Sequence, residues 1–115
     1  MDGHSPILAS TNPAVIPYDP AFAYEMPYII SKGIERMYGN GEGKDENVMY
    51  YITVYNQPHH QPARPENLDV EGLHKGIYLY DEGKDLDNKV SLLASGVGMQ
   101  QALRCLLYTS DAADE

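Results

Sequence analysis

The stretch from Tyr18 to Gly39 constrains the fold of this chain most, because it predicts one amphipathic helix with a defined start and stop. Asp19 is the predicted N-cap, since its carboxylate can accept hydrogen bonds from the free N–H groups of the first turn. Pro20 suits the first helical position, where its missing N–H costs nothing. Gly39 predicts a left-handed end to the helix.

Apolar side chains at helical spacing predict the face of this helix that turns toward the core. They are Phe22, Met26, Ile29, Ile30, Ile34 and Met37. Pro27 interrupts the pattern, because proline removes one intrahelical hydrogen bond. We therefore expect the helix to kink near Ala23, after its second turn.

Apolar segments on either side of the helix predict two strands. Residues 14–16 form a short apolar run, and Val48 to Tyr55 is β-branched and aromatic almost throughout. A near-continuous apolar run that follows a helix is typical of a strand buried in a parallel sheet. Strand, helix and strand together predict a right-handed βαβ unit, with residues 40–47 as an exposed polar loop.

A proline-rich stretch separates this unit from the remaining residues. Residues 56–68 hold three prolines and almost no aliphatic side chains, which predicts a connector at a domain boundary. Beyond it the patterns predict a helical turn at 70–75, strands at 77–80 and 90–94, and a tight turn into a helix at 95–103. The fold class is therefore α/β, with a second α/β unit that begins near Gly76.

Composition narrows the class of protein. The chain has 115 residues, of which 43% are apolar, enough for one modest domain. Its 17 acidic and 8 basic residues give a net charge of −9, which argues against nucleic acid or an anionic membrane as a partner. A single cysteine, Cys105, excludes an internal disulfide and is typical of a reducing cytoplasm. No apolar run approaches the length of a membrane span, and we expect no signal peptide.

Few side chains form a recognisable chemical motif. His4 follows Asp-Gly in a predicted turn, where its ring either faces a cleft or lies on the surface. His59 and His60 are adjacent and point different ways, with no third ligand at a metal-site spacing, so we predict no metal site. Gly96 and Gly98 begin a G-x-G-x-x-G pattern that fails at Gln101, so they predict a strand-to-helix turn and no dinucleotide site.

Longer blocks of the sequence resemble one enzyme family. The blocks are DGHSPILASTNPAVIPYDPAFAYE, GIERMYG, YYITVYNQP and VEGLHKGIYLY. From Met1 to about Leu103 they resemble, in order and spacing, the homodimeric type of pyruvate dehydrogenase E1 component. The resemblance implies a thiamin-diphosphate and Mg²⁺ enzyme of the transketolase-like superfamily. Such an enzyme decarboxylates pyruvate and passes the two-carbon unit to the lipoyl group of the dihydrolipoyl acetyltransferase, E2.

The resemblance also implies a domain layout and a location. Residues 1–57 correspond to the later part of the pyrimidine-binding domain, which contains a parallel sheet, and 58–75 to a connector. Residues 76–104 correspond to the start of the C-terminal domain. The implied partners are a second E1 subunit and E2, in the cytoplasm, with neither nucleic acid nor membrane. A non-catalytic interaction module derived from such an enzyme is the alternative.

Site residues are implied only where the chain matches the family. The DGHS turn resembles the active-centre loop, which places Asp2 and His4 at the pyruvate-facing end of the site. His4 is the expected proton donor or hydrogen-bond partner to the pyruvate carboxylate or the enamine oxygen. Asn56 falls where transketolases carry a phosphate-gripping arginine, and pyruvate has no phosphate. Many members have glutamate at the position of Gln57, so a charged role there is not carried over.

Two features depart from the family. The glutamate that activates the aminopyrimidine and the GDG…N motif that holds Mg²⁺ and the diphosphate are absent, so we expect no cofactor-binding residue here and no activity of the chain alone. The stretch from Cys105 to Glu115 looks like a translated sequencing adapter, which predicts a non-native tail at 105–115. The other interpretation is a natural helix end with an acidic tail.

Overall fold

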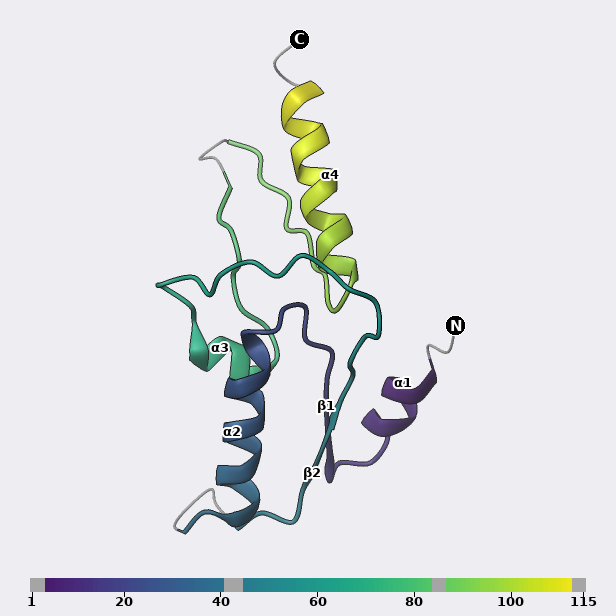
Figure 1. Cartoon of the computed structure of the whole chain (residues 1–115), viewed down its shortest axis with the longest axis vertical. Coiled ribbons are helices and arrows are strands. Elements are labelled where there is room, and N and C mark those ends of the chain that lie inside the picture. Colours follow the sequence, from purple (N-terminus) through teal and green to yellow (C-terminus); the bar gives the residue numbers. More distant parts are fainter. Residues whose placement is uncertain (1–3, 41–44, 84–86, 113–115) are drawn as a thin grey trace.

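The structure, a computed structural model, describes residues 4–40, 45–83 and 87–112, with side chains as far as Tyr108. Figure 1 shows short strands between helices, and a last helix that projects from the rest of the molecule. In chain order the elements are α1 (His4–Ser10), β1 (Val15–Tyr18), α2 (Glu25–Tyr38), β2 (Met49–Ile52), α3 (Val70–Lys75) and α4 (Gly98–Ala112).

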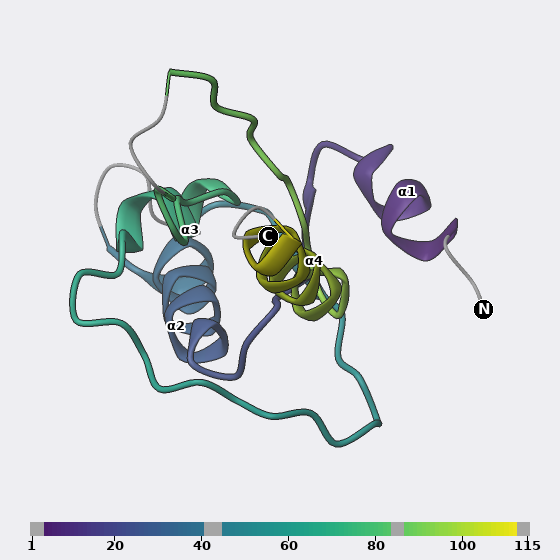
Figure 2. The same cartoon turned by 90° about the horizontal axis from the view of Figure 1, so that it is seen from above.

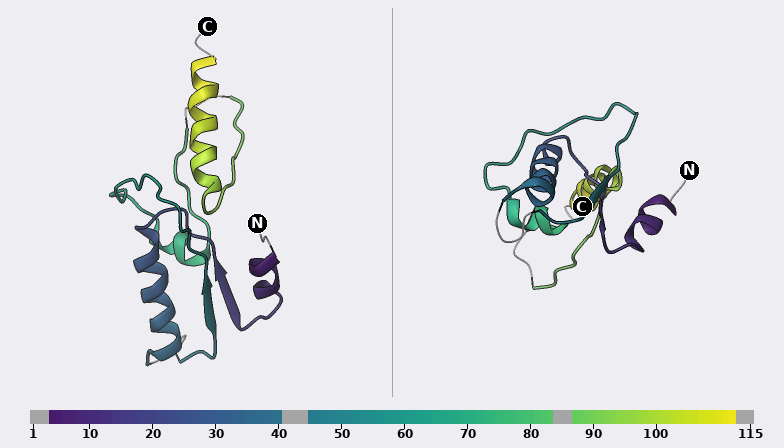
Figure 3. Two further views of the ribbon diagram at one scale, coloured as in Figure 1. Left: turned by 45° about the vertical axis from the view of Figure 1, so that its right-hand side comes forward. Right: turned by 90° about the horizontal axis from the view of Figure 1, so that it is seen from below.

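The two strands and the helix between them form a strand–helix–strand unit. β1 and β2 pair in parallel, with Val15 opposite Met49 and Tyr18 opposite Ile52. α2 and α1 lie on opposite sides of this strand pair, as Figures 2 and 3 both show. The predicted parallel pairing across a helix is confirmed, and the structure agrees with an α/β fold.

The predicted start of α2 is wrong. Tyr18 ends β1, and α2 begins at Glu25, six residues after Asp19. Asp19 therefore caps no helix, because its carboxylate accepts hydrogen bonds from hydroxyl groups of other segments. The N–H group of Ala21 is taken by the side chain of Glu25, whose Oε2 accepts from it at 2.8 Å. Residues 21–24 consequently form turns that lead into the helix.

The predicted kink at Pro27 and the left-handed stop at Gly39 are also wrong. Pro27 is the third residue of α2, where the N–H groups have no intrahelical partner in any case, and too little helix precedes it to be bent. Gly39 has φ −73° and ψ 168°, an extended conformation, and its N–H donates to the carbonyl of Glu35 at 2.8 Å.

The buried face of α2 is rotated from the predicted one. It carries Glu25, Ile29 and Gly33, whereas Ile30 and Ile34 expose 44% and 53% of their surface. Gly33 explains the rotation, because a Cβ there would lie 2.9 Å from the ring of Tyr50. The helix approaches β2 closely only with this glycine turned inward. Among the described residues the buried apolar side chains are Phe22, Ile29 and Leu73.

The prediction that the second strand is buried on both faces is wrong. β2 spans only Met49–Ile52, and Met49 and Tyr51 expose 61% and 36% of their surface. The alternation arises because α2 packs against one side of the pair, while short α1 contacts β1 on the other. After β2, residues 56–68 run as an irregular connector, as predicted.

α3 forms where its sequence predicts, at Val70–Lys75. The Asp69 carboxylate caps it by accepting from the N–H of Gly72 at 2.9 Å. Gly76 ends it with φ 93°, a left-handed conformation that glycine adopts without strain. The cap and the stop both come from residues next to the helix, which is why local sequence sufficed.

The two strands predicted after α3 do not form. Residues 77–80 and 90–94 have no strand pairing, and Val90 and Leu93 expose 96% and 76% of their surface. A strand needs a neighbour to take its backbone hydrogen bonds, and no other described strand pairs its backbone with these two segments. The predicted turn at Gly96 into a helix is confirmed, since α4 begins at Gly98. None of the helices among the described residues has the length and apolar character needed to cross a membrane.

Candidate functional site

The carboxyl edge of the sheet carries a cluster of polar side chains. Parallel strands end at the same edge, and here β1 ends at Tyr18 and β2 at Ile52. Asp19 follows β1 directly, while Thr53 and Tyr55 follow β2. In open α/β sheets this edge is the usual place for ligands.

The Asp19 carboxylate joins three separate parts of the chain. Its Oδ1 accepts from the hydroxyls of Thr53 at 2.5 Å and Tyr55 at 2.8 Å, and its Oδ2 accepts from Ser95 Oγ at 2.8 Å. The N–H of Gly96 donates to the backbone carbonyl of Asp19 at 3.0 Å. We call these five residues the Asp19 junction. It ties the turn before α4 to the ends of both strands.

Gly96 is required by the geometry of the junction. Its φ of +49° lies in the left-handed region, and the residue is buried. A Cβ at this position would collide with the Tyr55 hydroxyl and would lie 2.6 Å from both carboxylate oxygens of Asp19. Burial, and next the hydrogen bond to Asp19, raise the pKa of Tyr55 above its ordinary value.

A buried carboxylate lies at the start of α2. Glu25 is 4% exposed, and its Oε1 accepts from the hydroxyl of Tyr78 at 2.6 Å. Its other oxygen accepts from the Ala21 N–H. The hydroxyl of Tyr24 lies 2.9 Å from that of Tyr78, so Tyr24 donates to Tyr78 and Tyr78 donates to Glu25. Burial first, and the Glu25 carboxylate second, raise the pKa of Tyr78 far above its ordinary value.

A cavity of about 180 Å³ lies between the two carboxylates. Its lining includes Tyr18, Asp19, Glu25, Tyr78, Ser95 and Met99. This space is smaller than a typical ligand pocket of about 300 Å³ or more. Neighbouring hydroxyl and N–H groups already donate to both carboxylates, so the arrangement orders the surrounding segments and supplies no pair of nucleophile and base.

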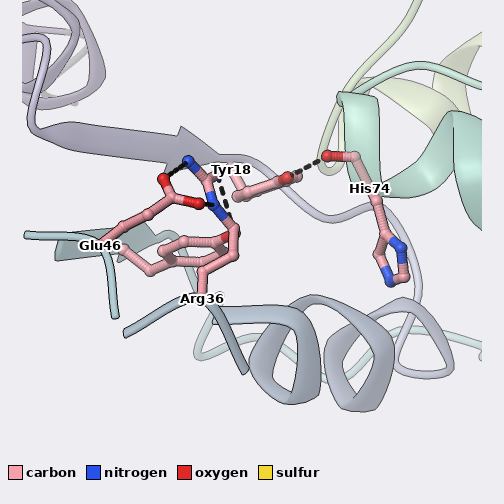
Figure 4. Close-up of polar contacts among 5 residues, drawn as sticks. Tyr18, Arg36, Glu46 and His74 are labelled. Carbon is pink, nitrogen blue, oxygen red and sulfur yellow. Dashed lines mark hydrogen bonds and ion pairs between the residues drawn. The ribbon is translucent and has the colours of Figure 1, made fainter. Parts of the chain in front are cut away.

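A third polar group connects the far end of α2 to the strands (Figure 4). Arg36 donates from Nε and Nη2 to the carboxylate of Glu46, at 3.0 and 2.5 Å, and from Nη1 to the hydroxyl of Tyr50 at 3.3 Å. The ring of Tyr50 stacks on Tyr18, which donates to the carbonyl of His74 at 2.5 Å. The hydrogen bonds between Arg36 and Glu46 raise the pKa of the guanidinium and lower that of the carboxyl. This group holds α2, both strands and α3 together.

The residues that the resemblance assigns to the site are placed as follows. Asp2 lies outside the described residues. His4 is exposed and is the first residue of α1, so the expectation that it sits in a turn is wrong. Asn56 is exposed beyond the end of β2 and forms no hydrogen bond with a described residue, so the structure does not join it to His4. Gln57 is exposed as well. The catalytic roles of these residues stay predictions.

The adjacent histidines differ in their surroundings. His59 is half-buried, with its ring 6.5 Å from that of Tyr55, whereas His60 is exposed. Over the described residues, no three or more side chains of histidine, cysteine, aspartate and glutamate gather where they could hold a metal ion.

Sequence reasoning missed the residues that build the carboxyl edge. A partial signal was available for Asp19, because it lies three residues after the predicted strand at 14–16, whereas Thr53 lay inside the predicted strand at 48–55. No local signal identifies Tyr78 or Ser95, which reach their partners from 53 and 76 residues away.

Four tyrosines with raised pKa values predict loss of stability at alkaline pH. The pKa values of Tyr18, Tyr24, Tyr55 and Tyr78 are all raised, chiefly by burial. Below about pH 10 these groups are neutral in the folded and unfolded chain alike. Above it the unfolded chain loses protons first, so we expect the free energy of unfolding to fall as the pH rises through 10 and beyond.

Urea titrations between pH 8 and 11, with tyrosinate absorbance at 295 nm, measure this dependence. Tyr78→Phe should make the alkaline loss of stability less steep. Tyr38→Phe is the control, because Tyr38 is 77% exposed and makes no side-chain hydrogen bond to a described residue. Equal slopes in all three proteins would contradict the prediction.

Comparison with known proteins identifies the family to which this chain is similar. A family model described as pyruvate dehydrogenase E1 component middle domain matches residues 1–62. The pyruvate dehydrogenase E1 component of Corynebacterium glutamicum is 62% identical over 104 residues, which cover 90% of this chain and 11% of that protein. The Mycolicibacterium smegmatis protein of the same name is 58% identical over 112 residues, which cover 96% of this chain and 12% of that protein. The Escherichia coli K12 protein of the same name is 50% identical over 95 residues, which cover 83% of this chain and 10% of that protein. The chain thus spans about a tenth of the length of these curated relatives.

Proposed function

Because this chain belongs to the family of the pyruvate dehydrogenase E1 component, we propose that it is an internal part of such an enzyme. The observation that carries the proposal is the middle-domain match over residues 1–62, together with 62% identity to a named E1 component over 104 residues. The parent enzyme would carry out thiamin-diphosphate-dependent oxidative decarboxylation of pyruvate and pass the acetyl unit to lipoyl groups. A second E1 subunit and the acetyltransferase E2 are its proposed partners, in the cytoplasm.

Within that parent we propose a division into domains. Residues 1–57 form the later part of a transketolase-like pyrimidine-binding domain, 58–75 the connector and 76–104 the start of the next domain. The strand–helix–strand unit supports the first assignment, because it lies entirely inside the matched residues 1–62. We also propose that residues 105–115 are not native to the parent, which reading the source DNA across this region tests.

The described residues do not fit thiamin diphosphate and Mg²⁺ by themselves. They contain no metal-binding group of three or more ligands, and the carboxylate oxygens of Asp19 and Glu25 already accept hydrogen bonds from neighbouring donors. We propose that the residues which anchor the cofactor belong to other parts of the parent enzyme.

The contribution of this chain to the reaction would lie on the substrate side. We propose that Asp2 and His4 face the pyruvate end of the site and that His4 donates a proton or a hydrogen bond there. The exposure of His4 at the start of α1 supports this role, because the imidazole is accessible. Asn56 would face the substrate from the carboxyl edge of the sheet, where it is also exposed.

A graft into a relative tests the proposal. The purified 115-residue chain, given thiamin diphosphate, Mg²⁺ and pyruvate, should release no carbon dioxide. Residues 1–104 in place of the matching segment of the Corynebacterium glutamicum protein should give an enzyme that decarboxylates pyruvate. His4→Ala in that graft should lower kcat by about 10²–10⁴, the usual contribution of a general acid.

His60→Ala is the matched control, since His60 is an exposed histidine of the connector. An active graft whose kcat is unchanged by His4→Ala would contradict the role of His4 alone. A graft that folds but is inactive would contradict the functional proposal. It would favour the alternative, a non-catalytic interaction module derived from such an enzyme. Turnover by the isolated chain would contradict the assignment as an incomplete part.

A further inference from the structure

Asn56, the proposed substrate-side residue at the carboxyl edge, follows a segment that has left the sheet. The last backbone hydrogen bond from this segment to β1 runs from the N–H of Thr53 to the carbonyl of Tyr18, at 3.0 Å. Beyond it, residues 54–57 form no backbone hydrogen bond with a described residue. The pairing of the strands alone therefore does not fix the position of Asn56.

Two side chains of that segment are bound to Asp19. Thr53 and Tyr55 lie two residues apart, a spacing that puts side chains on one face of an extended chain. Both hydroxyls donate to the same carboxylate oxygen of Asp19, Oδ1, at 2.5 and 2.8 Å. Tyr55 directly precedes Asn56, so its hydrogen bond fixes the chain next to the proposed substrate-side residue.

The backbone on both sides of Asp19 is constrained. Tyr18, which ends β1, stacks on the ring of Tyr50 in the neighbouring strand, with the ring centres 5.5 Å apart. Pro20 follows Asp19, and the ring of a proline keeps the residue before it out of the helical conformation. The Asp19 carboxylate is therefore an acceptor with a defined place at the end of β1.

We propose that Asp19 is a positioning residue for Asn56. It acts through the hydroxyls of Thr53 and Tyr55, which its carboxylate holds at the carboxyl edge of the sheet. In this role Asp19 does not touch the substrate. The inference rests on the proposed function, because the place of Asn56 matters only if the parent enzyme binds pyruvate at this edge. All four residues lie within the matched residues 1–62.

A double-mutant cycle in the graft into the Corynebacterium glutamicum protein tests this role. Asn56→Ala should raise KM for pyruvate by about two- to tenfold with kcat little changed, the effect of losing one hydrogen bond that binds the substrate. Asp19→Ala should raise KM by a similar factor, because Asn56 then loses its place. The double variant should be no worse than Asn56→Ala alone, since both changes remove the same contact.

Milder variants separate positioning from folding. Tyr55→Phe removes only the hydroxyl next to Asn56 and should also raise KM, by a factor no larger than that of Asp19→Ala. Asp19→Asn keeps a carbonyl oxygen that accepts from the same hydroxyls, so its KM should lie closer to that of the unaltered graft. Tyr38→Phe is the control, because Tyr38 is 77% exposed on α2 and should leave KM unchanged. If Asp19→Ala fails to fold by circular dichroism, Tyr55→Phe and Asp19→Asn decide.

In an active graft, losses that multiply in the double variant would overturn the positioning role, as would a KM that Asp19→Ala and Tyr55→Phe leave unchanged. A graft that folds but is inactive would contradict the proposed function instead. The positioning is then decided by backbone ¹⁵N order parameters of the 115-residue chain. Tyr55→Phe should lower them at residues 54–57 and leave those of α2 unchanged, and equal values at 54–57 would overturn the inference.

Discussion

Replacing Ile29 by alanine is expected to lower the free energy of unfolding by about 2–5 kcal/mol, the range for truncating a large buried aliphatic side chain. Ile29 is 1% exposed and lies on the inward face of α2. Only Phe22 and Leu73 accompany it as buried apolar side chains among the described residues. This loss is a large fraction of the about 5–15 kcal/mol by which domains are stable, so the variant should unfold at a clearly lower urea concentration.

Urea denaturation followed by circular dichroism measures this change. Ile34→Ala is the matched control, because Ile34 lies on the same helix and exposes 53% of its surface. It should change the free energy of unfolding by about 0.5 kcal/mol or less, as surface substitutions do. If the two alanine variants lost equal stability, the assignment of the buried face of α2 would be wrong.

Replacing Glu25 by alanine should lower the free energy of unfolding by about 2–3 kcal/mol, because hydrogen bonds to charged groups are strong and their buried donors are left unpaired. Glu25 is 4% exposed and accepts from the Ala21 N–H and the Tyr78 hydroxyl. Both hydrogen bonds fix the turn that begins α2. The loss should therefore include fraying of the first turn of the helix, seen as faster amide exchange at residues 25–28.

Glu25→Gln separates the charge from the shape of the side chain. It keeps an acceptor for one donor and should cost less stability than alanine. It should also bring the ionisation of Tyr78 to lower pH, because the Glu25 carboxylate is the second cause of the raised pKa of Tyr78. Burial, the larger cause, should still hold that pKa above its ordinary value. Glu66→Gln, at an exposed glutamate, is the control, and an unchanged Tyr78 titration in Glu25→Gln would contradict the assigned network.

Local patterns predicted the elements whose ends depend on neighbouring residues. The apolar runs before and after the helix predicted the parallel strand pair, and α3 begins and ends at the predicted residues. The resemblance carried by blocks such as YDPAFAYE agrees with the family match over residues 1–62. The predicted roles of Asp2, His4 and Asn56 came from that resemblance. The structure describes His4 and Asn56, whereas Asp2 lies outside the described residues.

Several of the failures share a physical cause, since they concerned residues with distant partners. Asp19 and Pro20 satisfy every local rule for a helix start, yet the Asp19 carboxylate binds hydroxyls that lie 34, 36 and 76 residues away. Gly33 has no local role as a helix former, yet its contact with Tyr50 decides which face of α2 is buried. Residues 90–94 have the pattern of a strand, but a strand also requires a partner.

The sequence by itself determined the order of strand and helix, the position of α3, the turn before α4 and the family, because spacing and block identity are properties of neighbouring residues. Only the tertiary structure decided where α2 begins, which side of it is buried and how Asp19 and Glu25 are used. Each of those outcomes is a competition for a hydrogen-bond acceptor or a packing surface. For Asp19 the donors are hydroxyls from distant parts of the chain, and for Gly33 the contact is the ring of Tyr50. Only the folded structure brings these groups together.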